Sequence, residues 1–436
     1  MKVGGKTILI LILISITVCF SSLAQTKTDS LFLNQIIRAD SSLLFQKVIE
    51  EASKFRCQII YTQIDRTNAG TPRFKQHYFN VNPDLYFNPA SMVKMPMAFL
   101  ALEKTNRLKN KGVTKDTPMV FDSSYPKQIA MLTDPTAENQ KPSVAQFIKR
   151  AFLISENDPY NRLYQFVGQG PANRALQKRG YRSARITRQF MGYTEDQNRH
   201  TNGIRFLSES GQLIYQQPPA FNKDSFRFPP PVLIGDAHIN RNEQLVRGPF
   251  DFTKHNNISL EDLQQMLQAV VFPTSVSAKK RFKISESDRL FLLQYLSQYP
   301  SETNYPLYDD SVYYDSYVKF FFKTDNGKMP KHIRVFNKVG WAYGFLTDVS
   351  YIVDTLHNID YFLSATLYVN SDGVVNDSKY DEKTTGFPFL LQLGQLIYNY
   401  ELKRPRTIRP ELGFQGLNYP KRTEISNRTP MKEVDN

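Results

Sequence analysis

Apolar residues recur along most of this chain at the spacings of regular secondary structure. Periods of three and four residues predict helices, whereas short apolar runs bounded by turn residues predict strands. Helices are expected over residues 31–53, 91–106, 143–152, 158–168 and 384–402, with two more opened by the capping residues Ser259 and Ser285. Strands are expected over residues 57–65, 73–81, 332–338, 345–354 and 360–369.

The order of these elements predicts the fold class. Strands begin the pattern, helices fill the middle, and three strands followed by a helix close it. Strands that are grouped apart from helices are typical of α+β folds. We therefore expect an α+β protein whose antiparallel sheet is built from both chain ends, with helices packed on it and an all-helical section inserted between the two groups of strands.

The first 24 residues predict an export signal. Lys2 and Lys6 precede an apolar stretch over residues 8–20, and small residues end at Ala24, so cleavage is expected before Gln25. The alternative is an uncleaved N-terminal anchor. No later segment reaches the roughly 18 apolar residues of a membrane-spanning helix. The protein is therefore expected to be exported, either periplasmic or secreted, without a transmembrane span once the signal is removed.

The composition is that of a globular protein. Apolar residues make up 41% and charged residues 22%, which excludes disordered and collagen-like chains. Two cysteines, one of them inside the signal, exclude a disulfide framework, and six scattered histidines provide no metal-binding pattern. No cofactor and no metal are therefore expected. Residues 25–402 form the expected domain, and residues 403–436 form a basic tail whose prolines prevent regular structure.

The chain is strongly basic, with a net charge of +14 that falls to +12 when Lys2 and Lys6 leave with the signal. An exported basic protein is attracted to anionic surfaces, so the cell envelope is a candidate partner. Nucleic acid is disfavoured because the sequence contains no block of five consecutive basic residues. A solvated basic surface without a specific partner is an equal alternative.

A serine and a lysine at the start of a predicted helix carry the first chemical indication. Ser91 and Lys94 are three positions apart and therefore share one helix face. Burial lowers the proton affinity of a lysine, which would make Lys94 a base for the Ser91 hydroxyl, and N–H groups of the first turn can stabilise an oxyanion. Such a pair often arises by chance, and the alternative is a capping serine beside a surface lysine.

Two later segments extend this pair into an ordered set. Ser-Glu-Asn at 155–157 lies between predicted helices, and Lys-Val-Gly at 338–340 ends a predicted strand. With Ser-x-x-Lys at 91–94, they resemble the S-x-x-K, S-D-N and K-T-G motifs of class A β-lactamases and penicillin-binding proteins, which are serine hydrolases. The resemblance covers residues 31–402 and implies the β-lactamase/transpeptidase-like fold. The long gap between the last two motifs implies an insertion at about residues 216–330.

The resemblance also implies a role for each motif residue. Ser91 would be the acylated nucleophile, and Lys94 would accept its proton. Ser155 would pass a proton toward the leaving nitrogen, while Asn157 would bind the amide side chain of the substrate and orient Lys94. Lys338 would add positive potential, which lowers the proton affinity of Lys94 and attracts a substrate carboxylate.

Two positions depart from the family motifs. Glu156 replaces an aspartate, a change of one methylene that keeps the charge. Val339 replaces a threonine and removes a hydroxyl that would bind the substrate carboxylate. Because a lost charge-assisted hydrogen bond costs about 1.5–3 kcal/mol, recognition of β-lactams or cell-wall peptides is expected to be weakened or replaced. Gly340 is counted among the substrate-binding residues, and Trp341 either walls the substrate cleft or packs a strand.

The base for deacylation is the least defined part of the predicted site. Class A enzymes use a glutamate on a loop after the second motif, and Glu195 is the nearest acid here, although its register differs. The alternative for Glu195 is a loop residue in a salt bridge. Without a base, the acyl-enzyme would turn over slowly, as in a penicillin-binding protein.

Two classes of function follow from these residues. The first is an exported serine hydrolase that forms an acyl-enzyme at Ser91 with a β-lactam, a cell-wall peptide ending in D-Ala-D-Ala, or a related amide or ester. The second is a catalytically weak or inert relative that binds cell-wall fragments or a protein partner. The second class is favoured by Val339, the missing loop glutamate, the long insertion and the basic tail. The complete set of nucleophile-side residues favours the first.

Overall fold

The computed structural model describes residues 31–228, 230–324, 327–410, 412, 416–423 and 428–434. The export signal expected at residues 1–24 therefore lies outside the described residues. In the part of the chain that is described, no helix has the length and apolar character needed to cross a membrane.

The helices and strands of the described chain have the following bounds. The α-helices are α1 Leu33–Arg38, α2 Leu43–Glu50, α3 Lys94–Arg107, α4 Val144–Leu153, α5 Asn157–Val167, α6 Gln169–Lys178, α7 Leu260–Val271, α8 Glu286–Ser297 and α9 Phe387–Lys403. The strands are β1 Gln58–Arg66, β2 Pro72–Phe79, β3 Met119–Phe121, β4 Ile204–Leu207, β5 Leu213–Gln217, β6 Leu233–Ile234, β7 Ala237–Ile239, β8 Leu245–Arg247, β9 Phe250–Asp251, β10 Ile333–Ala342, β11 Phe345–Asp354, β12 Ile359–Tyr368 and β13 Val374–Val375. Two short turns also matter for the site, the 3₁₀ turn η1 Ala90–Val93 and the π turn η8 Glu382–Gly386.

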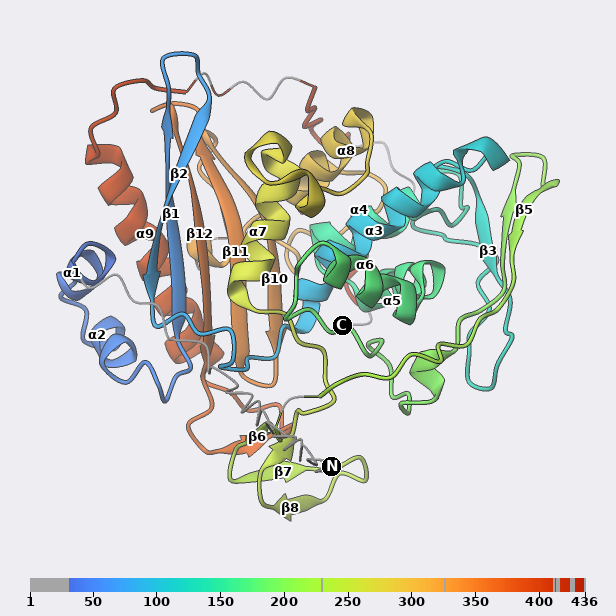
Figure 1. Ribbon diagram of the computed structural model, residues 1–436, viewed down its shortest axis with the longest axis horizontal. Helices are drawn as coiled ribbons and strands as arrows, with labels where there is room; N and C mark the ends of the chain where they lie inside the picture. Colours follow the sequence, from blue (N-terminus) through green and yellow to red (C-terminus); the bar gives the residue numbers. More distant parts are fainter. Residues whose placement is uncertain are drawn as a thin grey trace, which may run out of the picture.

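Five long strands form one antiparallel sheet in the order β10-β11-β12-β1-β2 (Figure 1). Strand β1 pairs with β12 through Ile60 opposite Ser364, so the beginning and the end of the chain meet inside the sheet. This arrangement confirms the α+β class and the expected antiparallel sheet built from both chain ends. Strand β10 is an edge strand, so one side of its backbone has no strand partner.

Both faces of the sheet are buried. Alternate residues of a strand point to opposite faces. Ile59 and Tyr61 accordingly belong to the core shared with α1, α2 and α9, whereas Ile60 belongs to the core shared with α3, α4, α5 and α7. Figure 1 shows α1, α2 and α9 on one side of the sheet and α7 on the other. The helices α3, α4 and α5 lie on the same side as α7 and are called the helical block below. The edge strand β10 thereby lies next to the helical block.

The helix expected over residues 31–53 is in fact two helices. The first one, α1, ends with Ala39 as its C-cap. Ser42 then begins α2, because its hydroxyl accepts a hydrogen bond from the Phe45 amide at 3.3 Å. The apolar period continues across the break, so it did not reveal the interruption. Ser259 and Ser285 cap α7 and α8, as the sequence predicted.

The expectation of an all-helical inserted section is wrong for residues 213–251. This stretch contains the short strands β5 to β9, and only α7 and α8 that follow it are α-helical. Its prolines and glycines cannot continue a helix, so its backbone groups find partners in short ladders instead. Figure 1 shows β6, β7 and β8 beyond one end of the main sheet.

The described part of the C-terminal tail lies along the body of the protein. Met431 forms a parallel bridge with Tyr308, and Arg422 pairs with Asp310 at 2.9 Å. Arg428 donates a hydrogen bond to the carbonyl of Ala137 at 2.8 Å. No helix or strand occurs among its described residues after α9. The domain limits of 25–402 stay a prediction.

Candidate active site

The three motifs meet where the helical block touches the edge strand β10. Ser91 lies in η1 at the start of α3, Ser155 lies in the connection from α4 to α5, and Lys338 lies on β10. Strand and turn are in close contact at Gly340, since a Cβ atom there would lie 2.4 Å from the Pro89 carbonyl oxygen. Only glycine allows this approach, so Gly340 has a steric function besides the substrate contact predicted for it.

Lys94 is the centre of the hydrogen-bond network. Its Nζ lies 2.7 Å from Ser91 Oγ, 2.8 Å from Asn157 Oδ1 and 3.4 Å from Ser155 Oγ, and it also donates to the Ser155 carbonyl. Lys94 is fully buried. This burial lowers its pKa well below the usual value of 10.5, and the nearby charge of Lys338 lowers it further. A lysine in this state is suited to accept the proton of the Ser91 hydroxyl.

Lys338 continues the network on the other side of Ser155. Its Nζ donates to Ser155 Oγ at 2.7 Å and to the Val339 carbonyl at 2.9 Å. Burial lowers the pKa of Lys338 to about 7, and the charge of Lys319 adds to this effect while Asp348 opposes it. Ser155 Oγ therefore lies between two amines that both bind protons weakly, an arrangement that can relay a proton.

The acid of the second motif anchors the turn that carries Ser155. The buried carboxylate of Glu156 accepts hydrogen bonds from Arg150 at 2.6 Å and from the Tyr308 hydroxyl at 2.6 Å. Arg150 also contacts Asp134 at 3.2 Å. Ser155 has a φ of +72°, a conformation that residues other than glycine rarely adopt. The buried ion pair holds this strained turn in place, which positions Ser155 between the two lysines.

A pocket of about 380 Å³ opens beside Ser91. Ser91, Ser155, Asn157 and Val339 line it from the motifs. Trp341 also lines it, with 38% of its surface exposed, and its ring packs edge-on against a phenylalanine of α9 with centroids 5.1 Å apart. Trp341 therefore forms part of the pocket wall and also packs against α9.

Part of the pocket wall carried no local sequence pattern and was missed. Tyr317 precedes β10, Tyr343 lies in the turn between β10 and β11, and Tyr380 and Glu382 lie just before α9. No motif or spacing connects these segments. Their one common property is that they reach the same end of the sheet, which only the folded structure shows.

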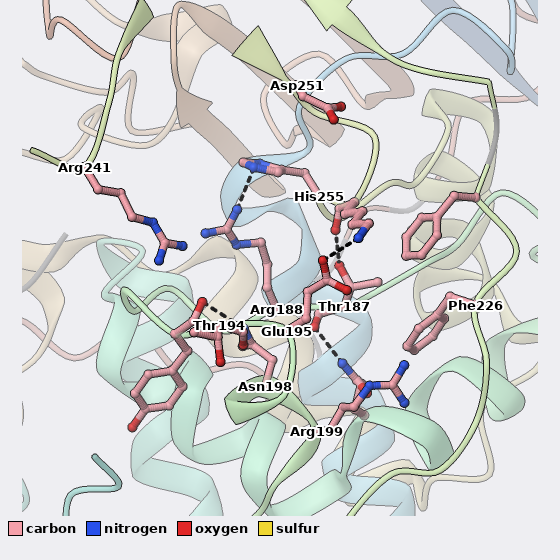
Figure 2. Close-up of a pocket in the computed structure, with 14 residues that line it drawn as sticks. Thr187, Arg188, Thr194, Glu195, Asn198, Arg199, Phe226, Arg241, Asp251 and His255 are labelled. Atoms are coloured by element: carbon pink, nitrogen blue, oxygen red, sulfur yellow. Dashed lines mark hydrogen bonds and ion pairs between the residues drawn. The ribbon is translucent and has the colours of Figure 1, made fainter. Parts of the chain in front are cut away.

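Glu195 does not line the pocket of Ser91. It forms an ion pair with Lys254 at 2.6 Å, at a separate pocket of about 350 Å³. Figure 2 shows Glu195 there together with Arg199 and His255. The structure thus corresponds to the alternative of a loop salt bridge and does not bring this acid to the nucleophile.

The aromatic ring of Phe190 lies against the amine of Lys94. The Nζ atom of Lys94 lies 5.1 Å from the centroid of the Phe190 ring. Among the described residues that line the Ser91 pocket, Glu382 is the only carboxylate. Glu195 is therefore not replaced by a second acid from the predicted loop in the described lining of this pocket.

Three potential metal ligands also come together, although the sequence pattern did not indicate them. The ligand atoms of His332, Asp354 and His357 lie within 4.8 Å of one another. The Asp354 carboxylate already accepts hydrogen bonds from the His357 ring at 2.7 Å and from the Tyr398 hydroxyl at 2.7 Å. The group lies at the opposite end of β10 from the Ser91 pocket, so it has no direct part in the chemistry there.

A family model described as "Beta-lactamase enzyme family" matches residues 44–400. The chain belongs to the β-lactamase enzyme family. This match confirms the resemblance on which the three motifs were interpreted, and the antiparallel sheet with its helices is the fold expected for that family. No curated protein matches the sequence.

Several solved structures are similar to this β-lactamase family member. The β-lactamase of Sphaerobacter thermophilus is 14% identical, with 82% of this chain and 96% of that chain covered and a TM-score of 0.43. A mutant of PBP-A in an acyl-enzyme complex with penicillin G is 14% identical, with 83% and 97% covered and a TM-score of 0.45. An ancestral class A β-lactamase is 13% identical, with 81% and 98% covered and a TM-score of 0.45. The assignment rests on the family match rather than on these similarities.

Proposed function

We propose that this member of the β-lactamase family is a serine hydrolase that forms an acyl-enzyme at Ser91. The observation that carries the proposal is the 2.7 Å contact between Ser91 Oγ and the Nζ of a fully buried lysine, Lys94, whose pKa is strongly lowered. A neutral amine at this distance can remove the hydroxyl proton as the oxygen attacks an acyl carbonyl. The backbone N–H of Ser91 can stabilise the oxyanion, whereas the N–H groups of Ala90 and Met92 are bonded to Asn88 Oδ1 and to the Pro89 carbonyl.

The network supports a path for the proton after the attack. The O–H bond of Ser91 breaks, an ester forms between Oγ and the acyl carbon, and Lys94 holds the proton. Ser155 Oγ lies within 3.4 Å of Lys94 Nζ and 2.7 Å from Lys338 Nζ, so it can deliver a proton to the leaving nitrogen or oxygen. Water then cleaves the ester and releases the acid.

Cleavage of the ester is proposed to be slow. The ring of Phe190 lies beside Lys94, where an acid could activate the water that cleaves the ester. Glu195 forms an ion pair with Lys254 in another pocket. The acyl-enzyme should therefore accumulate, as expected for a penicillin-binding protein. The proposed substrates are β-lactams, cell-wall peptides and related amides or esters. Export through residues 1–24, a periplasmic or secreted location and attraction to an anionic cell envelope belong to the same proposal.

Intact-mass spectrometry tests this function directly. Residues 25–436 are incubated with benzylpenicillin and, separately, with a 4-nitrophenyl ester, and the mass is followed over time. We expect a long-lived adduct on the wild type and none on Ser91→Ala. Ser53→Ala is the matched control, because this serine is exposed and its side chain has no hydrogen bond among the described residues. An adduct that persists in Ser91→Ala rejects the proposal. If neither reagent gives an adduct, the result favours the second class of function, a catalytically inert relative that binds cell-wall fragments or a protein partner.

A further inference from the structure

The wall of the Ser91 pocket carries negative charge and no positive charge. Among the described residues that line it, none is a lysine, an arginine or a histidine, and Glu382 is the single acid. Lys94 and Lys338 are buried behind this wall, where their amines are bonded to Ser155. A substrate carboxylate would therefore meet no cationic side chain in the wall, and Val339 provides no hydroxyl for it either.

The charge of Glu382 is only partly compensated by the groups around it. It lies in the π turn η8 and accepts a hydrogen bond from the side chain of Trp341, and no ion pair to it occurs among the described residues. Its neighbour Lys383 is exposed, and the charge of Lys383 offsets the effect of burial on the pKa of Glu382 only in part. Partial burial raises the pKa of Glu382, because the charge loses hydration without a compensating ion pair. A cationic group that enters the pocket would supply that compensation.

Aromatic side chains line the pocket together with this carboxylate. Tyr317, Trp341, Tyr343 and Tyr380 line the same pocket. The faces of aromatic rings attract ammonium groups, most strongly where water is excluded, and such rings with a carboxylate are a common way to bind a cation. The pocket therefore combines the two features that recognise an ammonium group, and none of the described residues that line it is a cation that would repel one.

We propose that the acyl substrate of this enzyme carries a primary ammonium group, which Glu382 binds within the aromatic wall of the Ser91 pocket. The inference rests on the proposed function and specifies its preferred substrate class: among the β-lactams, cell-wall peptides and related amides or esters, those that bear an amino group. Glu382 acts on the substrate's charge and takes no part in the transfer of the acyl group.

Three esters of matched length test the charge preference. The 4-nitrophenyl esters of 6-aminohexanoate, heptanoate and adipate end in an ammonium, a methyl and a carboxylate group. We expect the second-order rate constant for acylation to be about tenfold higher for the ammonium ester than for the methyl ester, and lowest for the carboxylate ester. Glu382→Gln should reduce the ammonium-to-methyl ratio to near one, and added salt should reduce it in the wild type. Glu195→Gln, in the separate pocket, should change no rate.

A binding measurement tests the inference independently of acylation at Ser91. Trp341 is the only tryptophan and contacts Glu382, so its fluorescence reports directly on this part of the pocket. Hexylammonium should change the emission of Ser91→Ala in a saturable manner, and Glu382→Gln should weaken this binding about tenfold. Equal rates with all three esters, or no effect of Glu382→Gln on ratio and binding, would overturn the inference while acylation at Ser91 stands. If the wild type is not acylated by any ester but still binds hexylammonium, the proposed enzyme function is rejected, whereas the ammonium site at Glu382 stands.

Discussion

Gly340→Ala should separate strand β10 from the turn that carries Ser91. A Cβ at position 340 would lie 2.4 Å from the Pro89 carbonyl oxygen and 3.0 Å from Cγ of Met92. Carbon and oxygen atoms in contact usually stay about 3.3 Å apart, so the two backbones must move apart by roughly 1 Å. The Pro89 oxygen cannot turn away at no cost, because it accepts the Met92 amide at 2.8 Å within η1.

The size of the effect follows from this displacement. Overpacking of a close contact costs about 1–3 kcal/mol of stability. A shift of about 1 Å between reacting groups can slow a reaction about a hundredfold, because Ser91 and the third motif no longer meet the substrate together. We therefore expect Gly340→Ala to lower the rate of adduct formation about a hundredfold and the free energy of unfolding by about 1–3 kcal/mol.

Time-resolved intact mass gives the acylation rate, and urea denaturation followed by circular dichroism gives the stability. Gly192→Ala is the matched control, because a Cβ there meets no atom within 4 Å and the backbone is not in the left-handed region. The control should change neither quantity. If Gly340→Ala acylates as fast as the wild type and unfolds at the same urea concentration, the close contact between β10 and η1 does not hold the site together.

Three further predictions concern the buried charges. Lys94→Met should slow acylation about 10²–10⁴-fold in the mass assay, since it removes the base; an unchanged rate would assign that role elsewhere. Glu156→Ala should lower the free energy of unfolding by about 3 kcal/mol in urea, because Arg150 loses its main partner; a loss below 1 kcal/mol would contradict this. The pKa values of Lys104 and Lys338 are lowered to about 7, so the unfolded chain, whose lysines titrate near 10.5, binds more protons between pH 7 and 9. The urea midpoint should rise over that range, and less so in Lys338→Met.

Local patterns were sufficient to predict the long elements and the motif residues. The strand expected over residues 345–354 coincides with β11, and Ser91 and Lys94 lie on one face at the start of α3, as their spacing required. The same reasoning failed at residues 31–53, where one apolar period spans two helices. It also failed for Glu195, because nearness in sequence to the second motif says nothing about which pocket a loop side chain enters.

Sequence patterns defined the candidate reacting groups, since Ser91, Lys94, Ser155 and Lys338 are recognisable from their residue types and short spacings. The tertiary structure decided what these groups can do. The pKa of Lys94 depends on complete burial and on the charge of Lys338, which comes from the far end of the chain. The charge of the pocket wall depends likewise on Glu382, which no motif includes. Both properties arise from desolvation and from distances between segments remote in sequence, and such quantities exist only once the chain has folded.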